Sequence, residues 1–232
     1  MTNKYFIITG TSKGIGRYLS EYYLEQGKIV FGCSRGESDL KNDNYYHFKA
    51  DVSNEKEVLQ MFHEIKKVTK KIDVLINNAG VASMNHTFLT PLKTMEYIYK
   101  INVFGTFLFC REAGKIMKSN KYGRIINFAT VATPLKLEGE AGYASSKAAI
   151  VNLTEILARE FSTYGITVNA IGPTPIETDL IRAVPKHKMD SLINQQVIKR
   201  LGEFQDVSNV IDFFIKPESD FVTAQTIYLG GL

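Results

Sequence analysis

Cysteine is scarce in this 232-residue sequence: only Cys33 and Cys110 are present, and neither stands in a CxxC or other metal-like spacing. Two isolated cysteines argue against a disulfide framework and indicate a reducing compartment. Histidine is also scarce, and the four histidines lack the spacing of metal ligands, which speaks against a metal-dependent reaction. They are His47, His63, His86 and His187.

Concentrated charge of one sign and long hydrophobic runs are missing too. The 28 basic and 24 acidic residues give a net charge of +4 and are spread along the chain, whereas nucleic-acid binding usually needs a concentrated basic face. The first apolar stretch, Tyr5–Ile8, is too short for a signal peptide or a membrane span. We therefore expect a cytoplasmic globular protein that binds neither nucleic acid nor a membrane.

Short apolar runs alternate with longer segments of helical periodicity, which predicts βαβ units around a parallel sheet. The expected strands are Tyr5–Ile8, Ile29–Cys33, Tyr45–Ala50, Val74–Asn77, Arg124–Phe128, Thr167–Ile171 and Thr226–Leu229. The expected helices include Asn54–Thr69, Thr94–Met117, one with Ile15, Leu19 and Tyr22 on its apolar face, and one with Ile150, Leu153, Leu157 and Phe161. Continuous apolar strands imply helices on both faces. The fold class is thus α/β, a doubly wound Rossmann-type parallel sheet.

No repeat or composition shift marks a second domain, so residues 1–232 are expected to form one domain. Its least patterned segment, Thr174–Arg200, is rich in polar residues and contains Pro175 and Pro185. Segments of this kind in compact domains are often functional. We expect a substrate lid at about residues 174–200.

A glycine-rich turn, TGTSKGIG from Thr9 to Gly16, lies between the first expected strand and the first expected helix. Gly10 would permit a sharp turn, Gly14 a close approach of phosphate, and Gly16 close packing of the helix on the sheet. The helix N-terminus would offer N–H groups to a pyrophosphate. The glycines could merely shape the turn, but their place between strand and helix favours dinucleotide binding.

The end of the second strand indicates which dinucleotide binds. An NAD-selective site usually carries an acidic residue there for the ribose 2′-hydroxyl, but this chain has Ser34 and Arg35. A guanidinium can bind a 2′-phosphate with paired charge-assisted hydrogen bonds, and Lys13 could reach the same phosphate. Both cations could instead be solvated surface charges, and Glu37 could still bind a ribose hydroxyl. The two cations favour NADP(H) over NAD(H).

Tyr143 and Lys147 stand four residues apart near the start of an expected helix, and therefore share one helical face. A free tyrosine has a pKa of about 10, too high for efficient proton transfer near neutrality. A nearby ammonium would lower it. A surface tyrosine with a chance lysine is the alternative. The position of the pair after the Arg124–Phe128 run, in a chain with a dinucleotide turn, favours catalysis.

Taken together, these motifs resemble those of the short-chain dehydrogenase/reductase family over nearly the whole chain, from Thr9 to about Gly231. The matching motifs are the TGxxxGIG turn, Asn77-Asn78-Ala79-Gly80, Asn102 within Ile101-Asn102-Val103, the Tyr143/Lys147 pair, and Val168-Asn169-Ala170-Ile171-Gly172-Pro173 followed by Ile176 and Thr178. The residues expected to bind the cofactor are Gly10, Ser12, Lys13, Gly14, Ile15, Gly16, Ser34, Arg35, Asp51, Val52, Asn78, Ala79, Gly80, Tyr143, Lys147, Pro173, Ile176 and Thr178.

The resemblance implies specific roles within that set. Asp51 and Val52 would flank the adenine, while Ile176 and Thr178 would hold the nicotinamide carboxamide. Blander interpretations remain, because Asp51 could simply end a strand and Asn77–Gly80 could be only a turn. Asn102, likewise, could be a polar residue at a helix irregularity.

The same resemblance implies the chemistry: hydride transfer between nicotinamide C4 and a carbonyl carbon, with Tyr143 exchanging the proton on oxygen. Lys147 would bind the ribose hydroxyls and lower the tyrosine pKa. Asn102 would hold a water that relays protons from Lys147 to solvent. The serine found in the family 13 positions before the tyrosine is Thr130 here, which keeps the hydroxyl but adds a stiffening methyl group.

Other departures from the family pattern lie outside the reacting centre. Thr174 stands where a glycine commonly follows the proline, Ala224 replaces the glycine of a late TGQ, and Gly230 replaces an aspartate. These changes bear on the shape of the substrate loop and on the C-terminal contacts.

Within the family, Gly165–Asn169 and Ile176–Asp179 are similar to segments of 3-oxoacyl-carrier-protein reductases. The two arginines that those enzymes use for the acidic carrier protein are Lys121 and Tyr164 here, which weakens that interpretation. A reductase of small ketones or sugar-derived carbonyls is an equal alternative, and a non-catalytic NADP-sensing protein is a lesser one.

The sequence does not name the substrate, but a partly apolar pocket is expected from Met84, Leu135, Leu137, Leu180 and Met189, each of which could also be ordinary core. The family resemblance further implies a homodimer or homotetramer, paired through Thr94–Met117 and Tyr143–Tyr164.

Overall fold

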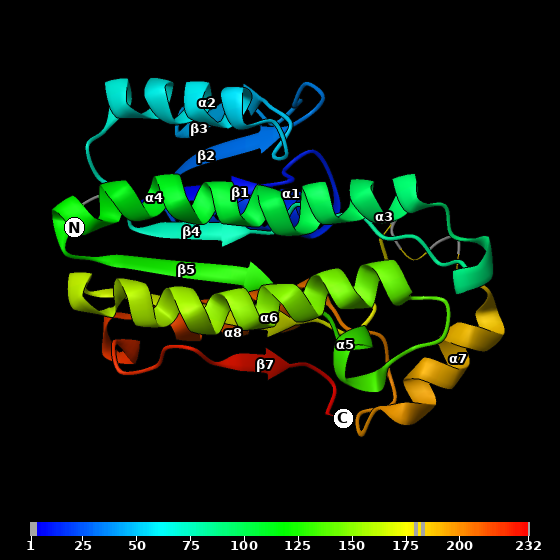
Figure 1. Ribbon diagram of the computed structural model, residues 1–232. Coiled ribbons are helices and arrows are strands. Elements are labelled where there is room, and N and C mark those ends of the chain that lie inside the picture. Colours follow the sequence, from blue (N-terminus) through cyan, green and yellow to red (C-terminus); the bar gives the residue numbers. More distant parts are fainter. Residues whose placement is uncertain (1–3, 179–180, 182–183, 232) are drawn as a thin grey trace.

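The computed structural model describes residues 4–178, 181 and 184–231, and within them a seven-stranded parallel sheet forms the centre of the molecule (Figure 1). The strands are β1 (Tyr5–Thr9), β2 (Ile29–Ser34), β3 (Tyr45–Lys49), β4 (Val74–Asn77), β5 (Gly123–Phe128), β6 (Ile166–Gly172) and β7 (Thr226–Tyr228). Their order across the sheet is β3-β2-β1-β4-β5-β6-β7. The α/β fold class expected from the sequence is confirmed.

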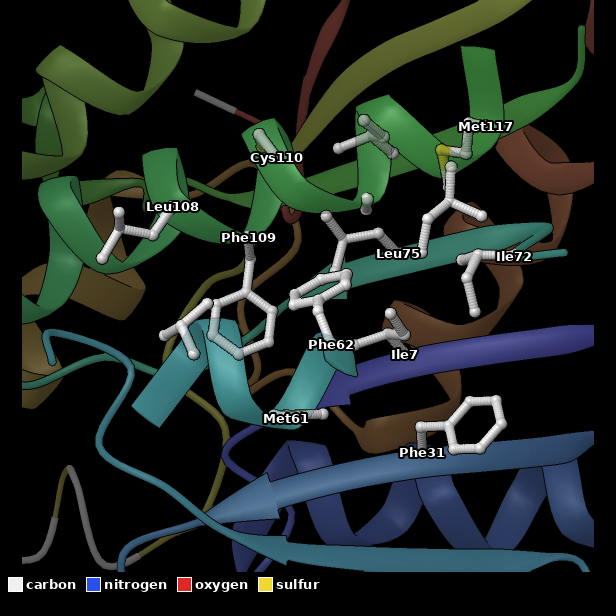
Figure 2. Packing of buried hydrophobic residues seen from close by; sticks show 14 of the residues in the cluster. Ile7, Phe31, Met61, Phe62, Ile72, Leu75, Leu108, Phe109, Cys110 and Met117 are labelled. Atoms are coloured by element: carbon white, nitrogen blue, oxygen red, sulfur yellow. The ribbon is translucent and has the colours of Figure 1, made fainter. Parts of the chain in front are cut away.

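Helices cover both faces of the sheet because successive strand residues point to opposite sides. On one face, α2 (Glu55–Val68), α4 (Thr106–Asn120) and α6 (Ala141–Phe161) pack on Ile7 and Leu75, with Phe62 and Phe109 between them (Figure 2). On the other face, α1 (Gly14–Glu25) and α8 (Phe204–Ile215) pack on alternate strand residues such as Phe6 and Ile8. Within the described residues, no helix combines the length and apolarity needed to cross a membrane.

The expected helix Thr94–Met117 is interrupted. It consists of α3 (Leu92–Tyr99), a π-helical stretch η2 (Lys100–Gly105) and α4. A π-turn contains one residue more than an α-turn, and such turns occur frequently at functional sites. Here the turn contains Asn102, whose side chain is fully buried.

The chain reverses direction across the sheet between β1 and β4, because β2 and β3 lie on one side of β1 and the later strands on the other. In doubly wound sheets, ligands bind at such a switch point, outside the carboxyl ends of the strands. The shorter helices α3, α5 (Ala132–Leu135) and α7 (Lys186–Gln195) gather at that end of the sheet (Figure 1). This end is therefore where the candidate site is to be sought.

Candidate active site

The turn after β1 is closed by contacts that require glycine. Gly10 has a φ of +75°, and a Cβ atom on Gly16 would lie 2.2 Å from the carbonyl oxygen of Gly10. Any side chain at position 16 would collide with the backbone, so α1 can begin directly against the turn. Ser12, Lys13, Gly14 and Ile15 line the adjoining cleft, while Gly16 lies beneath them. This is a cradle that a phosphate group fits.

The loops after β1 and β4 are joined across the switch point. Asn78 Nδ2 donates to the carbonyl oxygen of Thr9 over 2.9 Å, and the backbone N–H of Ala79 donates to Thr9 Oγ1 over 2.9 Å. Asn78, Ala79 and Gly80 line the cleft beside the glycine turn. The Asn78 side chain thus has a structural role, because it holds the two loops together.

Arg35, at the end of β2, lines the same cleft, and its guanidinium Nη1 donates to the hydroxyl of Tyr97 on α3 over 3.0 Å. Glu37, considered above as a competing ribose ligand, forms an exposed ion pair with Lys49 at 3.3 Å. Ser34, Asp51 and Val52 complete this end of the cleft. This end of the cleft therefore carries a positioned arginine.

Tyr143 and Lys147 lie on α6, and Thr130 follows β5; all three line the cleft. Lys147 is buried, and its Nζ donates to the carbonyl oxygen of Phe128 over 2.7 Å. The same nitrogen lies 6.0 Å from the centre of the Tyr143 ring. Burial raises the pKa of Tyr143, and the nearby Thr130 hydroxyl acts in the opposite direction. The structure thus brings the three residues together.

The direction of the Tyr143 pKa shift differs from the sequence-based expectation that Lys147 lowers it. Burial raises the pKa of Tyr143 from 10.0 to about 12, against the effect of Thr130, and the charge of Glu140 raises it further. Burial also lowers the pKa of Lys147 from 10.5 to about 8, which weakens its ammonium character. Desolvation of both groups explains the reversal, because it penalises each charged form.

Asn102 lies behind the cleft wall and links the loop after β4 to α6. Its Oδ1 accepts the backbone N–H of Val81 over 2.9 Å, and its Nδ2 donates to the carbonyl of Val81 over 3.0 Å and to Ser146 Oγ over 2.9 Å. Gly80 lies beside this network: a Cβ atom there would be 3.3 Å from Asn102 Oδ1 and 3.5 Å from Lys147 Nζ. Asn102 therefore fixes the β4 loop to α6 next to Lys147.

The cleft as a whole has a volume of about 1190 Å³. Pro173, Ile176 and Thr178 line it after β6, and of the expected substrate residues Met84, Leu135, Leu137 and Met189 line it as well. Leu180, also expected there, lies outside the described residues. Apart from Gly16 and Leu180, the expected cofactor and substrate residues thus line one continuous space.

Two departures from the family pattern have a visible structural effect. Ala224 adopts a left-handed φ of 59°, a conformation that favours the glycine found in the family. Thr174 is buried and hydrogen-bonded to Gln196 at the end of α7. Neither residue lies among Thr130, Tyr143 and Lys147.

Sequence reasoning overlooked Glu140 and Ser146. Glu140 lies three residues before Tyr143, is 7% exposed and lines the cleft. Ser146 is fully buried and receives the Asn102 hydrogen bond. An acid one helical turn from a candidate catalytic tyrosine could have been noticed from spacing alone, whereas the role of Ser146 depends on the three-dimensional contact.

Comparison with known proteins places the chain among reductases and dehydrogenases. A family model described as enoyl-(acyl carrier protein) reductase matches residues 10–231. The 3-oxoacyl-[acyl-carrier-protein] reductase FabG of Staphylococcus epidermidis is 31% identical over 241 residues, which cover 99% of this chain and 98% of that protein.

Solved structures show the same similarity. ElxO with NADP bound has a TM-score of 0.90 at 26% identity, and the match covers 98% of this chain and 97% of that chain. A 4-hydroxyisoleucine dehydrogenase complexed with NADH has a TM-score of 0.86 at 27% identity, with 99% and 98% covered. These two structures hold different nicotinamide dinucleotides.

Proposed function

The chain belongs to the short-chain dehydrogenase/reductase family, and we propose that it is an NADP(H)-dependent oxidoreductase that interconverts a ketone and a secondary alcohol. One observation carries the proposal: Thr130, Tyr143 and Lys147 line the same cleft as the glycine turn and Arg35. The nicotinamide cofactor supplies or accepts the hydride at the carbonyl carbon. The protein positions the groups and handles the proton.

In this proposal Tyr143 is the acid in ketone reduction. Its raised pKa keeps the phenol protonated at neutral pH, which is the form that can donate a proton to a carbonyl oxygen. The Thr130 hydroxyl provides a second hydrogen bond at the same oxygen. The apolar residues Met84, Leu135 and Leu137 line the cleft and would limit access of water to the reacting groups.

Lys147 and Asn102 act as supports. Lys147 would bind ribose hydroxyls, and its position is fixed by the hydrogen bond to Phe128. Asn102 keeps the β4 loop beside Lys147 through its bonds to Val81 and Ser146. The proton relay through a water on Asn102 remains a prediction.

NADP(H) is preferred in the proposal because Arg35 stands where an NAD-selective site has an acidic residue. The Tyr97 hydrogen bond limits the freedom of the Arg35 guanidinium at the cleft edge. The pairing of Glu37 with Lys49 leaves its carboxylate less suited to a ribose hydroxyl. The nicotinamide cofactor itself is supported by the relatives that hold NADP or NADH.

A 3-oxoacyl-carrier-protein reductase is the second candidate, supported by the FabG relative. Lys121 and Tyr164 lie two residues before β5 and β6, near the amino ends of these strands, whereas the cleft lies at the carboxyl ends. A carrier protein docked on them would not lie over this chain's own cleft. The structure therefore gives the small-ketone alternative more support.

The segment at about residues 174–200 is proposed as the substrate lid. It includes α7, none of whose residues is buried, and His187, Lys188, Met189 and Leu192 of this helix line the cleft. A helix held by few buried contacts can move at low cost. Its far end is fixed, since the N–H groups of Val197 and Ile198 donate to the carbonyls of Gly231 and Gly230.

We also propose a homodimer or homotetramer paired through α4 and α6, which lie side by side on one face (Figure 1). Phe107 on α4 and Ile156 on α6 are 42% and 45% exposed, and Phe104 in the adjoining η2 is 54% exposed. Exposed apolar side chains on neighbouring helices commonly mark an interface.

A cytoplasmic location, expected from the isolated cysteines, stays a prediction.

The direct test follows NADPH oxidation with a panel of small ketones, diketones, sugars and acetoacetyl thioesters. The proposal expects turnover of ketones that is lost in Tyr143→Phe while NADPH still binds. Turnover confined to the thioesters would support the second candidate. Tight NADPH binding with no turnover of any carbonyl would support a cofactor-sensing protein.

A further inference from the structure

Glu140 is a buried carboxylic acid beside the proposed reacting centre. It immediately precedes α6, so that it lies one turn from Tyr143, and it is 7% exposed. Residues three apart on a helix lie about 5–6 Å from each other at Cβ. Glu140 and Tyr143 line the same cleft, and the charge of Glu140 acts on the Tyr143 hydroxyl, so a substrate carbonyl on Tyr143 would lie near this carboxyl group.

The carboxyl group lacks the partners that would explain a structural role. Although Glu140 is the N-cap residue of α6, its side chain makes no capping hydrogen bond. Its Oε2 has no hydrogen-bond partner among the described residues. A buried polar group left without a partner costs folding free energy and calls for an explanation.

The surroundings of Glu140 oppose its ionisation. Burial raises its pKa from 4.5 to about 7, and Lys188 on the proposed lid acts in the opposite direction. The charge of Glu140 in turn raises the pKa of Tyr143. A neutral glutamine or an apolar residue at this position would avoid both effects, which suggests that the carboxyl group serves a ligand.

The substrate end has both apolar and polar lining residues, and Glu138 is a second acid among them, but an exposed one. Met84, Leu135, Leu137, Met189 and Leu192 line it together with Glu140. A buried acceptor among apolar side chains fixes the orientation of a small molecule that carries a matching donor.

Building on the proposed function, we propose that Glu140 determines substrate specificity by accepting a hydrogen bond from a hydroxyl or ammonium group close to the substrate carbonyl. The substrate class is then a hydroxy ketone or an amino ketone. A 3-oxoacyl thioester has only methylene groups beside its ketone and offers no donor to this carboxyl. Under this proposal, one side chain, Glu140, gives this chain a substrate preference that differs from that of the carrier-protein reductases.

Three ketones of nearly equal size test the proposal: hydroxyacetone, aminoacetone and butanone. They share the unit CH3–CO–CH2 and differ only in the hydroxyl, amino or methyl group attached to it. Wild type is expected to have a kcat/KM with NADPH at least about tenfold higher for the first two than for butanone. Glu140→Leu should remove that preference, so that its kcat/KM values for the three ketones become similar. Glu140→Gln should keep hydroxyacetone, because its amide oxygen still accepts, and lose aminoacetone.

Glu138→Leu is the matched control, because this acid lines the same cleft but is exposed; it should keep the wild-type order of the three ketones. NADPH binding by fluorescence verifies that each variant is folded. Equal kcat/KM for all three ketones, or a preference that survives Glu140→Leu, would overturn this proposal alone. No reduction of any carbonyl by wild type that binds NADPH would instead overturn the proposed function and this proposal with it.

Discussion

The hydroxyl of Thr174 donates a hydrogen bond to the side-chain oxygen of Gln196, and both residues are buried. Thr174 follows β6 and Gln196 follows α7, so this bond joins the two ends of the proposed lid. Gly230 packs on the same group: a Cβ atom there would lie 2.4 Å from Gln196 Oε1. Two departures from the family pattern, at positions 174 and 230, therefore meet at one side chain.

Thr174→Val is expected to destabilise the protein by about 1–3 kcal/mol, because the Gln196 oxygen loses its donor in a buried place. Urea unfolding followed by circular dichroism measures the change. Thr87→Val, at an exposed position, is the control and should change stability by less than about 0.5 kcal/mol. Equal stability of Thr174→Val and wild type would show that the bond does not hold the lid ends.

Arg35→Ala is expected to weaken NADPH binding by about 1.5–3 kcal/mol, the value of a charge-assisted hydrogen bond, and to leave NADH nearly unaffected. Titration of both dinucleotides by fluorescence measures the ratio of the two dissociation constants. Tyr97→Phe should show a smaller change in the same direction, since it frees the guanidinium without removing it. An unchanged ratio in Arg35→Ala would refute the assignment of NADP(H) selectivity to Arg35.

Thr130→Ala is expected to lower kcat by the equivalent of about 2.7–4 kcal/mol, because the reacting oxygen loses a preorganised donor. Thr130→Ser should keep or raise activity, as it retains the hydroxyl without the methyl group. Tyr143→Phe removes the proton donor and serves as the inactive reference. If Thr130→Ala is fully active while Tyr143→Phe is not, Thr133 becomes the hydroxyl to examine.

The pH dependence should distinguish the two reaction directions. Tyr143, with a pKa of about 12, stays protonated at neutral pH and can act as the acid, so ketone reduction should be efficient near pH 7. Reduction should fall as the pH rises through about 8, where Lys147 loses its charge. Alcohol oxidation needs the phenolate and should increase with pH. Initial rates from pH 6 to about 10 at constant ionic strength test this; fastest oxidation at the acidic end would contradict it.

Glu140→Gln should change the pH dependence of stability. The folded-state pKa of Glu140, about 7, lies above the ordinary 4.5, so its contribution is fully present below pH 4.5 and is lost as the pH rises through 7. Glutamine cannot ionise, so relative to wild type the variant should gain stability between pH 5 and pH 8, by about 1–3 kcal/mol. Thermal unfolding at both pH values measures the difference, and parallel curves for the two proteins would contradict the buried-carboxyl description.

The strands were predictable because parallel strands buried on both faces are continuous apolar runs. Val74–Asn77 has the expected bounds, and the other strands differ at their ends. Helix faces were less predictable. The expected face of α1 included Tyr22, but the structure buries Tyr23 more deeply, and Asp212 on α8 accepts hydrogen bonds from both hydroxyls. Which of the two tyrosines is buried thus depends on contacts with a residue 189 or 190 positions away in the sequence.

The candidate site, too, was predictable in part. Motif spacing was sufficient to gather the glycine turn, Arg35, Thr130, Tyr143 and Lys147 at one cleft. The direction of the Tyr143 pKa shift was not predictable, since it depends on how deeply the hydroxyl is desolvated and on where the Lys147 ammonium is held. The partnerless carboxyl of Glu140 could not be recognised either, because only a complete set of contacts shows that a partner is missing.

Because the stretch Lys100–Gly105 is π-helical, the number of residues in it affects the site more than it affects the fold. The wider turn takes in one extra residue, so a deletion within it would relax to an ordinary α-turn and keep α3 and α4 on their present faces. Asn102, however, would move out of reach of Val81 and Ser146. Relatives shortened here by one residue would thus be stable proteins with a displaced β4 loop. The length of this segment therefore shows whether a relative that keeps the fold also keeps the arrangement of the site.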